Sequence, residues 1–131
     1  HDFIAEARKV RKLVGGTLRQ AGVLAAAGII AIQKERERLI NDHENAYLLA
    51  ERILSNTKVT VNMEDVQTNI VRIDVSPSGH DAKTFQKGLQ ARGLKVGAIS
   101  ENLIRMVTYR EIQKKDVIEA SNIINQYCSS F

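Results

Sequence analysis

The segment from Ala21 to Ile32 contains only apolar residues and glycine, and it constrains the fold more than any other part of the chain. A helix that is apolar around its whole circumference must be buried on every side. A chain of 131 residues forms one small domain and has little other surface with which to enclose such a helix. The segment therefore predicts contact with a further domain, another subunit, or both.

A run of cations without any acid lies directly before this apolar segment. Residues 8–19 read RKVRKLVGGTLR, so basic side chains flank a Gly-Gly pair. Glycine lets the backbone turn sharply and approach a ligand closely, and a helix N-terminus carries unpaired N–H groups that suit a phosphate. There is no nucleotide P-loop signature GxxxxGK[ST]. From the residues alone, a phosphate site and a helix joint with solvated basic residues explain the run equally well.

Hydrophobic periodicity and turn signals predict three leading helices followed by a β-α-β-β-α unit. This order places the chain in the α/β (α+β) class. We divide it into a helical segment, 1–55, and a small C-terminal α/β domain, 56–131. The expected helices are 2–13, 17–33, 34–55, 81–92 and 114–127, and Asp2, Thr17 and Asp81 are the expected caps of the first, second and fourth. The expected strands are 66–75, 94–99 and 103–108. In the first of these strands, Val71, Ile73 and Val75 are expected to point inward.

The composition is typical of a globular protein in a reducing compartment. The chain is 44% hydrophobic and 26% charged with a net charge of +4, and its single cysteine, Cys128, cannot form an intrachain disulfide. We see no signal peptide, and the apolar run is too short to span a bilayer, so we expect a cytoplasmic protein. His43 has no second His or Cys nearby, which predicts a capping or packing role and no metal site.

Arg105 is the most informative single side chain. On a strand over 103–108 it shares a face with Leu103 and Val107, so the alternation predicts that it points inward among apolar residues. A guanidinium in such a place needs an anionic partner, and its planar fork matches a carboxylate. On the pattern alone, a structural salt bridge to an acid of the same chain is the favoured explanation.

Several separated motifs resemble the threonine aldolases, a family of pyridoxal 5'-phosphate (PLP) enzymes of fold type I. The basic segment is similar to the family's RRxRKxxGGGMRQAG, with Thr17-Leu18 where the family has Gly-Met. Residues 42–46 (DHENA) resemble its DHxNA helix start, and Thr68-Asn69 resembles its TN-strand. Residues 103–108 (LIRMVT) resemble its xxxRLVTH strand, with Tyr109 where a histidine often stands. The resemblance covers nearly the whole chain.

This resemblance implies a PLP-dependent lyase that cleaves threonine, allo-threonine and similar β-hydroxy-α-amino acids to glycine and an aldehyde. It implies that Arg105 binds the substrate α-carboxylate, and that Lys12 and Arg19 border the cofactor phosphate in a neighbouring subunit's site. In the family the covalent lysine lies upstream of the Gly-Gly segment. We therefore expect a C-terminal part without catalytic residues of its own, inactive alone, within a homodimer or homotetramer that binds neither nucleic acid nor membrane.

Two other functions stay open. A small basic module could bind single-stranded nucleic acid on the β-α-β-β-α half, but the predicted strands carry no aromatic residue for base stacking. The basic run also lies in the helical part and not on the sheet. A fold type I PLP enzyme of another reaction type is the second possibility, although the GGTLRQAG sequence favours the aldolases.

Overall fold

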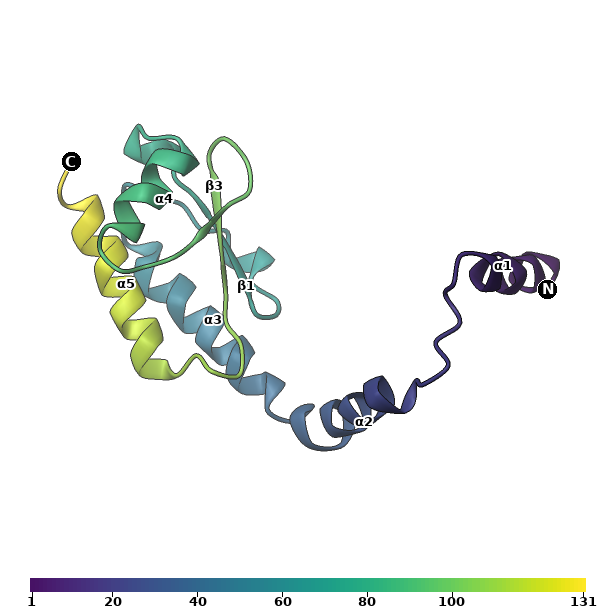
Figure 1. Cartoon of the computed structure of the whole chain (residues 1–131). Helices are drawn as coiled ribbons and strands as arrows, with labels where there is room; N and C mark the ends of the chain where they lie inside the picture. The colour runs from purple at the N-terminus through teal and green to yellow at the C-terminus, as the bar shows by residue number, and fades with distance from the viewer. The chain divides into compact units, whose positions relative to one another are not determined.

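The computed structural model describes residues 1–131 and consists of two compact units, His1–Arg36 and Glu37–Phe131 (Figure 1). The boundary between the two units lies between residues 36 and 37, so the third helix belongs to the second unit. Our division at residue 55, between a helical segment and a small α/β domain, stays a prediction. No helix of the chain combines the length and hydropathy needed to cross a membrane.

The first unit consists of two helices joined by an irregular segment. Helix α1 spans Asp2–Leu13, with His1 in the cap position, so Asp2 begins the helix instead of capping it. Helix α2 spans Gly22–Ile30 and continues into a π-helical turn, η1, at Ala31–Glu35. The helix predicted from residue 17 therefore starts later, and Thr17 does not cap it, because residues 14–21 form two turns joined by irregular backbone.

The second unit is built on a three-stranded sheet, with β1 at Ile70–Asp74, β2 at Gly97–Ala98 and β3 at Leu103–Val107. The strand order is β1-β3-β2, and β3 pairs antiparallel with both neighbours. The predicted β-α-β-β-α order and fold class are confirmed. The other elements are helix α3 at Leu39–Leu54, short 3₁₀ turns η2 at Met63–Asp65 and η3 at Ser76–Ser78, α4 at Ala82–Gln90 and α5 at Lys114–Cys128.

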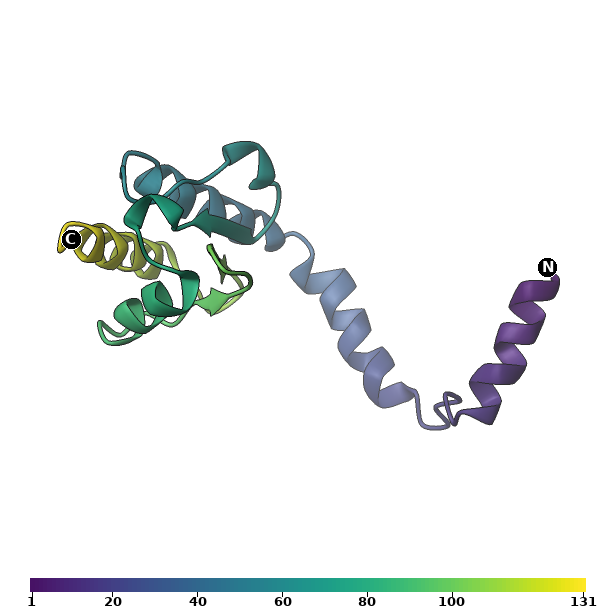
Figure 2. The ribbon, with the colours of Figure 1, turned by 90° about the horizontal axis from the view of Figure 1, so that it is seen from above.

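All three helices of the second unit lie on the same side of the sheet, as both ribbon views show (Figure 2). The covered face carries Val71 and Ile73 from β1 and Ile104 from β3, each with no exposed surface. Val71, Ile73 and Val75 are therefore inward, as predicted. The opposite face of the sheet has no layer over it, so the unit has two layers and one open sheet face.

Local signals fix the helix ends of this unit. The Asp81 carboxylate accepts a hydrogen bond of 2.6 Å from the Thr84 N–H, which caps α4 as predicted. That bond, aided by the Thr84 side chain, holds the pKa of Asp81 below its ordinary value of 3.8. Gly93, with a φ of +87°, follows the end of α4 in the left-handed region that favours glycine.

Candidate functional site

Arg105 lies in the middle of β3 on the face of the sheet that no helix covers. It shares this face with Leu103 and Val107 as predicted, but the face is the open one: Val107 is 40% exposed and Arg105 is exposed. The prediction that Arg105 points inward is therefore wrong. Both faces of β3 carry apolar side chains, Ile104 being the buried one, so alternation alone cannot identify the face that the helices cover.

The guanidinium of Arg105 has no ion pair and no side-chain hydrogen bond within the chain. The structural salt bridge that the pattern alone favoured is thus not formed by the chain's own acids. An arginine fork on an open sheet face is instead accessible to an anion arriving from outside, and a carboxylate matches its geometry bidentately.

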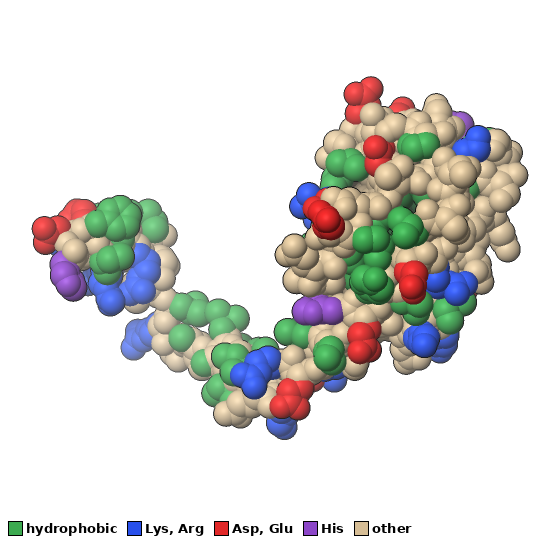
Figure 3. Space-filling model, turned by 180° about the vertical axis from the view of Figure 1, so that it is seen from behind, with side chains coloured by type: hydrophobic (Ala, Val, Ile, Leu, Met, Phe, Trp, Pro, Cys, Tyr) green, Lys and Arg blue, Asp and Glu red, His purple; other side chains and the backbone are tan.

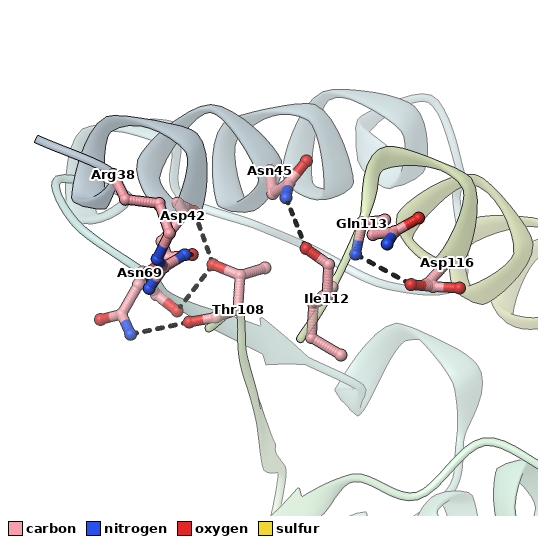
Figure 4. Close-up of polar contacts among 8 residues, drawn as sticks. All are labelled: Arg38, Asp42, Asn45, Asn69, Thr108, Ile112, Gln113 and Asp116. Atoms are coloured by element: carbon pink, nitrogen blue, oxygen red, sulfur yellow. Dashed lines mark hydrogen bonds and ion pairs between the residues drawn. The ribbon is translucent and has the colours of Figure 1, made fainter. Parts of the chain in front are cut away.

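Three of the motifs that resemble the threonine aldolases meet at the end of β3 (Figure 4). The hydroxyl of Thr108, a buried residue, donates a 2.6 Å hydrogen bond to the Asp42 carbonyl in α3. The Asn69 amide donates to the Thr108 carbonyl at 2.8 Å. Arg38 holds the Asp42 carboxylate with two hydrogen bonds of 2.8 and 3.1 Å. These contacts fasten the beginning of α3 and the beginning of β1 to the end of β3.

A second pair of polar contacts in the same view fixes the loop that follows β3. The Asn45 side chain donates to the Ile112 carbonyl at 3.0 Å, which ties this loop to α3. The Gln113 N–H donates to the Asp116 carboxylate at 2.8 Å, as part of a capping box that starts α5. The sequence predicted no capping box at Gln113 and Asp116, and the resemblance assigned no contacts to the motifs at residues 42–46, 68–69 and 103–108. Together they fix the position of the strand that carries Arg105.

A cavity of about 440 Å³ lies beside β3, where this strand extends past its short neighbour β2. Arg105 and Tyr109, which is 49% exposed, both line it. The remaining walls are mainly apolar and come from α3, α5, β2 with the segment before it, and β3 with the loop after it, namely Leu49, Leu94, Lys95, Val96, Gly97, Met106, Val107, Thr108, Ile112, Asp116, Val117 and Ala120. The cavity thus brings Tyr109, where the resembled family often has a histidine, into one site with Arg105.

Lys12 and Arg19 lie in the first unit, Lys12 in the last turn of α1 and Arg19 in the turn before α2. Both side chains are exposed, and neither has an ion pair or a hydrogen bond within the chain. Arg105 belongs to the second unit.

The Gly-Gly pair between these two cations closes the end of α1. The Gly16 N–H donates to the Arg11 carbonyl at 2.8 Å and the Gly15 N–H to the Lys12 carbonyl at 3.2 Å, the pairing of a Schellman motif. Gly15 has a φ of +74°, and a Cβ on Gly16 would lie 2.8 Å from the Arg11 Cγ. The end of α1 therefore requires both glycines, whether or not a ligand approaches them.

His43 and Cys128, which the sequence also singled out, differ in burial: His43 is exposed and Cys128 is buried. His43 is exposed in the second turn of α3 and its side chain makes no hydrogen bond, so the predicted capping or packing role is wrong. Cys128 is a free and buried cysteine, and burial raises the pKa of its thiol.

Comparison with protein families and curated proteins gives consistent matches. A family model described as beta-eliminating lyase matches residues 1–76. The chain is 35% identical over 116 residues to low-specificity L-threonine aldolase 1 of Arabidopsis thaliana, covering 88% of this chain and 32% of that protein. It is 32% identical over 120 residues to the low specificity L-threonine aldolase of Escherichia coli strain K12, covering 92% and 34%. The chain thus spans about a third of the length of these relatives.

Solved structures match the fold at low sequence identity. A NifS-like protein superposes with a TM-score of 0.65 at 14% identity, over 78% of this chain and 31% of that chain. The structure of MppP soaked with the product 2-ketoarginine gives a TM-score of 0.60 at 9% identity, over 76% and 30%. At these identities the two likenesses show the fold alone.

Proposed function

The chain belongs to the beta-eliminating lyase family and, within it, is a threonine aldolase relative; from this premise we propose that it forms the C-terminal part of a PLP-dependent enzyme that cleaves β-hydroxy-α-amino acids. The proposed substrates are threonine and allo-threonine, and the products are glycine and an aldehyde. The similar proteins of Arabidopsis thaliana and Escherichia coli are low-specificity L-threonine aldolases, which supports this reaction. A cytoplasmic location remains part of the proposal.

The observation that carries the proposal is the placement of Arg105. It is an exposed guanidinium without an internal partner, on the strand that the family resemblance assigns to substrate carboxylate binding. A bidentate pair with a carboxylate also limits rotation of the bound amino acid, which aligns the bond to be broken. Arg105 thus orients the substrate in addition to binding it.

The fastened end of β3 explains how a side chain without internal contacts can be placed accurately. Thr108 follows directly after the last residue of β3, three residues beyond Arg105. It is hydrogen-bonded to Asp42 in α3 and to Asn69, which precedes β1. The position of the guanidinium is therefore set by the backbone and by the bound carboxylate. We infer that the residues around Thr108 act as positioning residues for Arg105.

The residues of the first unit fit the phosphate of PLP. Lys12 and Arg19 are exposed cations without internal partners, on either side of the turn that Gly15 and Gly16 form. When bound, PLP supplies an electron sink for the electron pair released by cleavage of the bond between Cα and Cβ. By the family resemblance the covalent lysine lies in a part of the protein outside this chain. We therefore expect no aldolase activity from this chain alone.

The apolar helix α2 supports an assembly with a large domain or a second subunit. Val23 and Leu24 are 78% and 66% exposed within this chain, and hydrophobic side chains reach the surface along much of the first unit (Figure 3). Exposed apolar area of this extent on a soluble protein marks an interaction surface. We propose that it is buried in a homo-oligomer of the full-length enzyme.

A second candidate reaction is β-elimination, because the matching family model is described as beta-eliminating lyase. Both reactions begin from an amino acid whose carboxylate Arg105 could bind, but their products differ. Aldol cleavage of threonine yields glycine and acetaldehyde, whereas elimination of water gives an enamine, which water then hydrolyses to a keto acid and ammonia. Product identity therefore distinguishes the two functions.

The test is steady-state kinetics of the full-length enzyme with threonine and allo-threonine, measuring aldehyde, glycine and ammonia. Arg105→Ala should lower kcat/KM by roughly 30- to several-thousand-fold, since it removes a charge-assisted partner. Arg105→Lys should recover only part of this, because an ammonium cannot reproduce the fork. Formation of ammonia without glycine would favour elimination. Near-normal kcat/KM in Arg105→Ala, with a lowered melting temperature, would assign Arg105 a structural role.

The phosphate assignment has its own measurement. In the full-length enzyme, Arg19→Ala should weaken PLP retention more than it raises the substrate KM, because an anion loses one of its two cations. Equilibrium dialysis of the cofactor measures retention without relying on activity. Unchanged PLP affinity combined with a raised KM would show that Arg19 does not contact the phosphate.

A further inference from the structure

The open face of the sheet places a second arginine directly opposite Arg105. In the antiparallel register of β1 and β3, Arg72 pairs with Arg105, and both residues are exposed on the same face. Side chains of directly opposed residues have Cβ atoms about 5 Å apart. On the other side of Arg105, β2 contributes Gly97, which has no side chain. We call these three paired residues, one from each strand, the arginine row: Arg72 in β1, Arg105 in β3 and Gly97 in β2.

Nothing in the chain neutralises the arginine row. Neither Arg72 nor Arg105 has an ion pair or a side-chain hydrogen bond. The acid on the same face, Asp74, pairs with Leu103, two residues along the strands from the arginine pair. Its carboxylate accepts hydrogen bonds from the N–H, at 2.8 Å, and from the hydroxyl of Ser76. Like charges directly opposite in a sheet repel, so the row is stabilised only when an anion binds between the two guanidinium groups.

The surroundings of the row favour an anion with two acid groups. One guanidinium fork satisfies both oxygens of a single carboxylate, so Arg105 alone suffices for one acid group and Arg72 leaves a second positive charge unmatched. On one side the row adjoins Ile70 and Val107, which are 36% and 40% exposed and offer no counter-charge. On the other side it adjoins Leu103 and Asp74, whose carboxylate is held by Ser76, and across the strands Gly97 leaves the row beside Arg105 without a side chain.

We propose that Arg72 is a specificity-determining residue and that the arginine row binds a dicarboxylate. Resting on the proposed function, this makes the preferred substrate a β-hydroxy amino diacid of the 3-hydroxyaspartate type, with its α-carboxylate on Arg105 and its second carboxylate on Arg72. The bond between Cα and Cβ breaks, the hydroxyl loses its proton and becomes the carbonyl of glyoxylate, and the electron pair left at Cα takes up a proton to give glycine. The atoms of the substrate are thus all accounted for in two products.

The first measurement is anion binding by this chain, which does not depend on activity. Succinate and acetate are titrated at constant ionic strength while the guanidinium N–H signals of Arg72 and Arg105 are followed by NMR. Succinate should shift both signals and bind about 10- to 100-fold more tightly than acetate. Arg72→Gln should abolish the difference, and Lys87→Gln, an equal change of charge on α4, should preserve it. Equal affinity for the two anions, or an unchanged preference in Arg72→Gln, would overturn the proposal.

The second measurement is the ratio of kcat/KM for 3-hydroxyaspartate to that for threonine in the full-length enzyme. The ratio should exceed one and should fall about 10- to 100-fold in Arg72→Gln but not in Lys87→Gln. Cleavage of threonine with a ratio that Arg72→Gln leaves unchanged would overturn this inference while the proposed function stands. If the enzyme cleaves neither substrate but the first measurement shows a preference for succinate, the proposed function and the substrate assignment are wrong. That result would still support a dicarboxylate site at Arg72 and Arg105.

Discussion

The two units of this chain use apolar residues in opposite ways. In the second unit, Ile53, Phe85 and Ile104 are fully buried in one continuous core between helices and sheet. In the first unit neither helix has a single buried residue, although α2 is composed only of apolar residues and glycine. Apolar composition therefore creates a core only where the topology supplies a second layer to cover it.

The charged residues differ between the units in the same way. In the second unit Arg38 and Asp42 form a bidentate pair that helps to fasten α3, and the carboxylate of this pair is almost fully buried. In the first unit Lys12 and Arg19 have no partner within the chain. The second unit thus contains an ion pair with a nearly buried carboxylate, whereas the ion pair of the first unit, Lys9–Glu6, is exposed to water.

Amide hydrogen exchange should show the largest difference between the units. In this chain, amides of α3 and β3 should exchange only through global unfolding, which requires a free energy of about 5–15 kcal/mol. Amides of α1 and α2 should exchange through local opening that requires almost no free energy. In the full-length oligomer, residues 21–32 should become protected because a partner covers them. Rapid exchange through this segment in the oligomer would contradict the proposed interface.

Truncation of one phenylalanine in each unit should give the next largest contrast. Phe85 has no exposed surface and lies 5.0 Å from the Tyr127 ring, so Phe85→Ala should cost about 3–5 kcal/mol of unfolding free energy. Phe3 is 81% exposed, so Phe3→Ala should change stability by less than about 0.5 kcal/mol. Urea denaturation of this chain measures both. Similar losses in the two variants would show that the first unit also has a core.

Removal of one hydroxyl tests the joint at the end of β3. Thr108→Val keeps the side-chain shape but loses the hydrogen bond to the Asp42 carbonyl, which should cost about 1–2 kcal/mol. Thr60→Val makes the same change at an exposed position with no side-chain hydrogen bond, and serves as the control. Equal stability of the two variants in urea denaturation would remove the structural role that we assign to Thr108.

The smallest expected effect is the pH dependence of the α4 cap. The lowered pKa of Asp81 means that its carboxylate stabilises the fold above the ordinary value of 3.8, and that this contribution is lost as the pH falls through the lower folded value. Asp81→Asn keeps an oxygen acceptor at the cap but does not titrate. Melting temperatures between neutral and strongly acidic pH should therefore fall slightly less in Asp81→Asn. Identical profiles would show that the cap does not depend on the charge.

Local signals in the sequence predicted most of the second unit. The order of strands and helices, the cap at Asp81 and the inward residues of β1 follow from periodicity and turn chemistry, and the structure confirms them. The cap predicted at Thr17 is wrong because a Schellman motif at the end of α1 uses the two preceding glycines and delays the next helix. Pattern alone does not distinguish that motif from an immediate helix start.

The candidate site could be predicted only in part. Resemblance identified the strand of Arg105 and the motifs around Thr108, but it did not show that these motifs fasten α3, β1 and β3 to one another. It also did not reveal Arg72 as a neighbour of Arg105, because the two residues are far apart in sequence and meet only through strand pairing. Such pairings depend on register, which a single strand does not encode.

The sequence by itself determined the elements, their order and the family, because helix and strand periodicity, caps and motifs are properties of neighbouring residues. Only the tertiary structure decided which face of β3 the helices cover and that β3 is the central strand of the sheet. Both faces of that strand are partly apolar, so the choice depends on which side α3, α4 and α5 occupy. That choice places Arg105 on the open face, opposite Arg72, where a carboxylate can reach it.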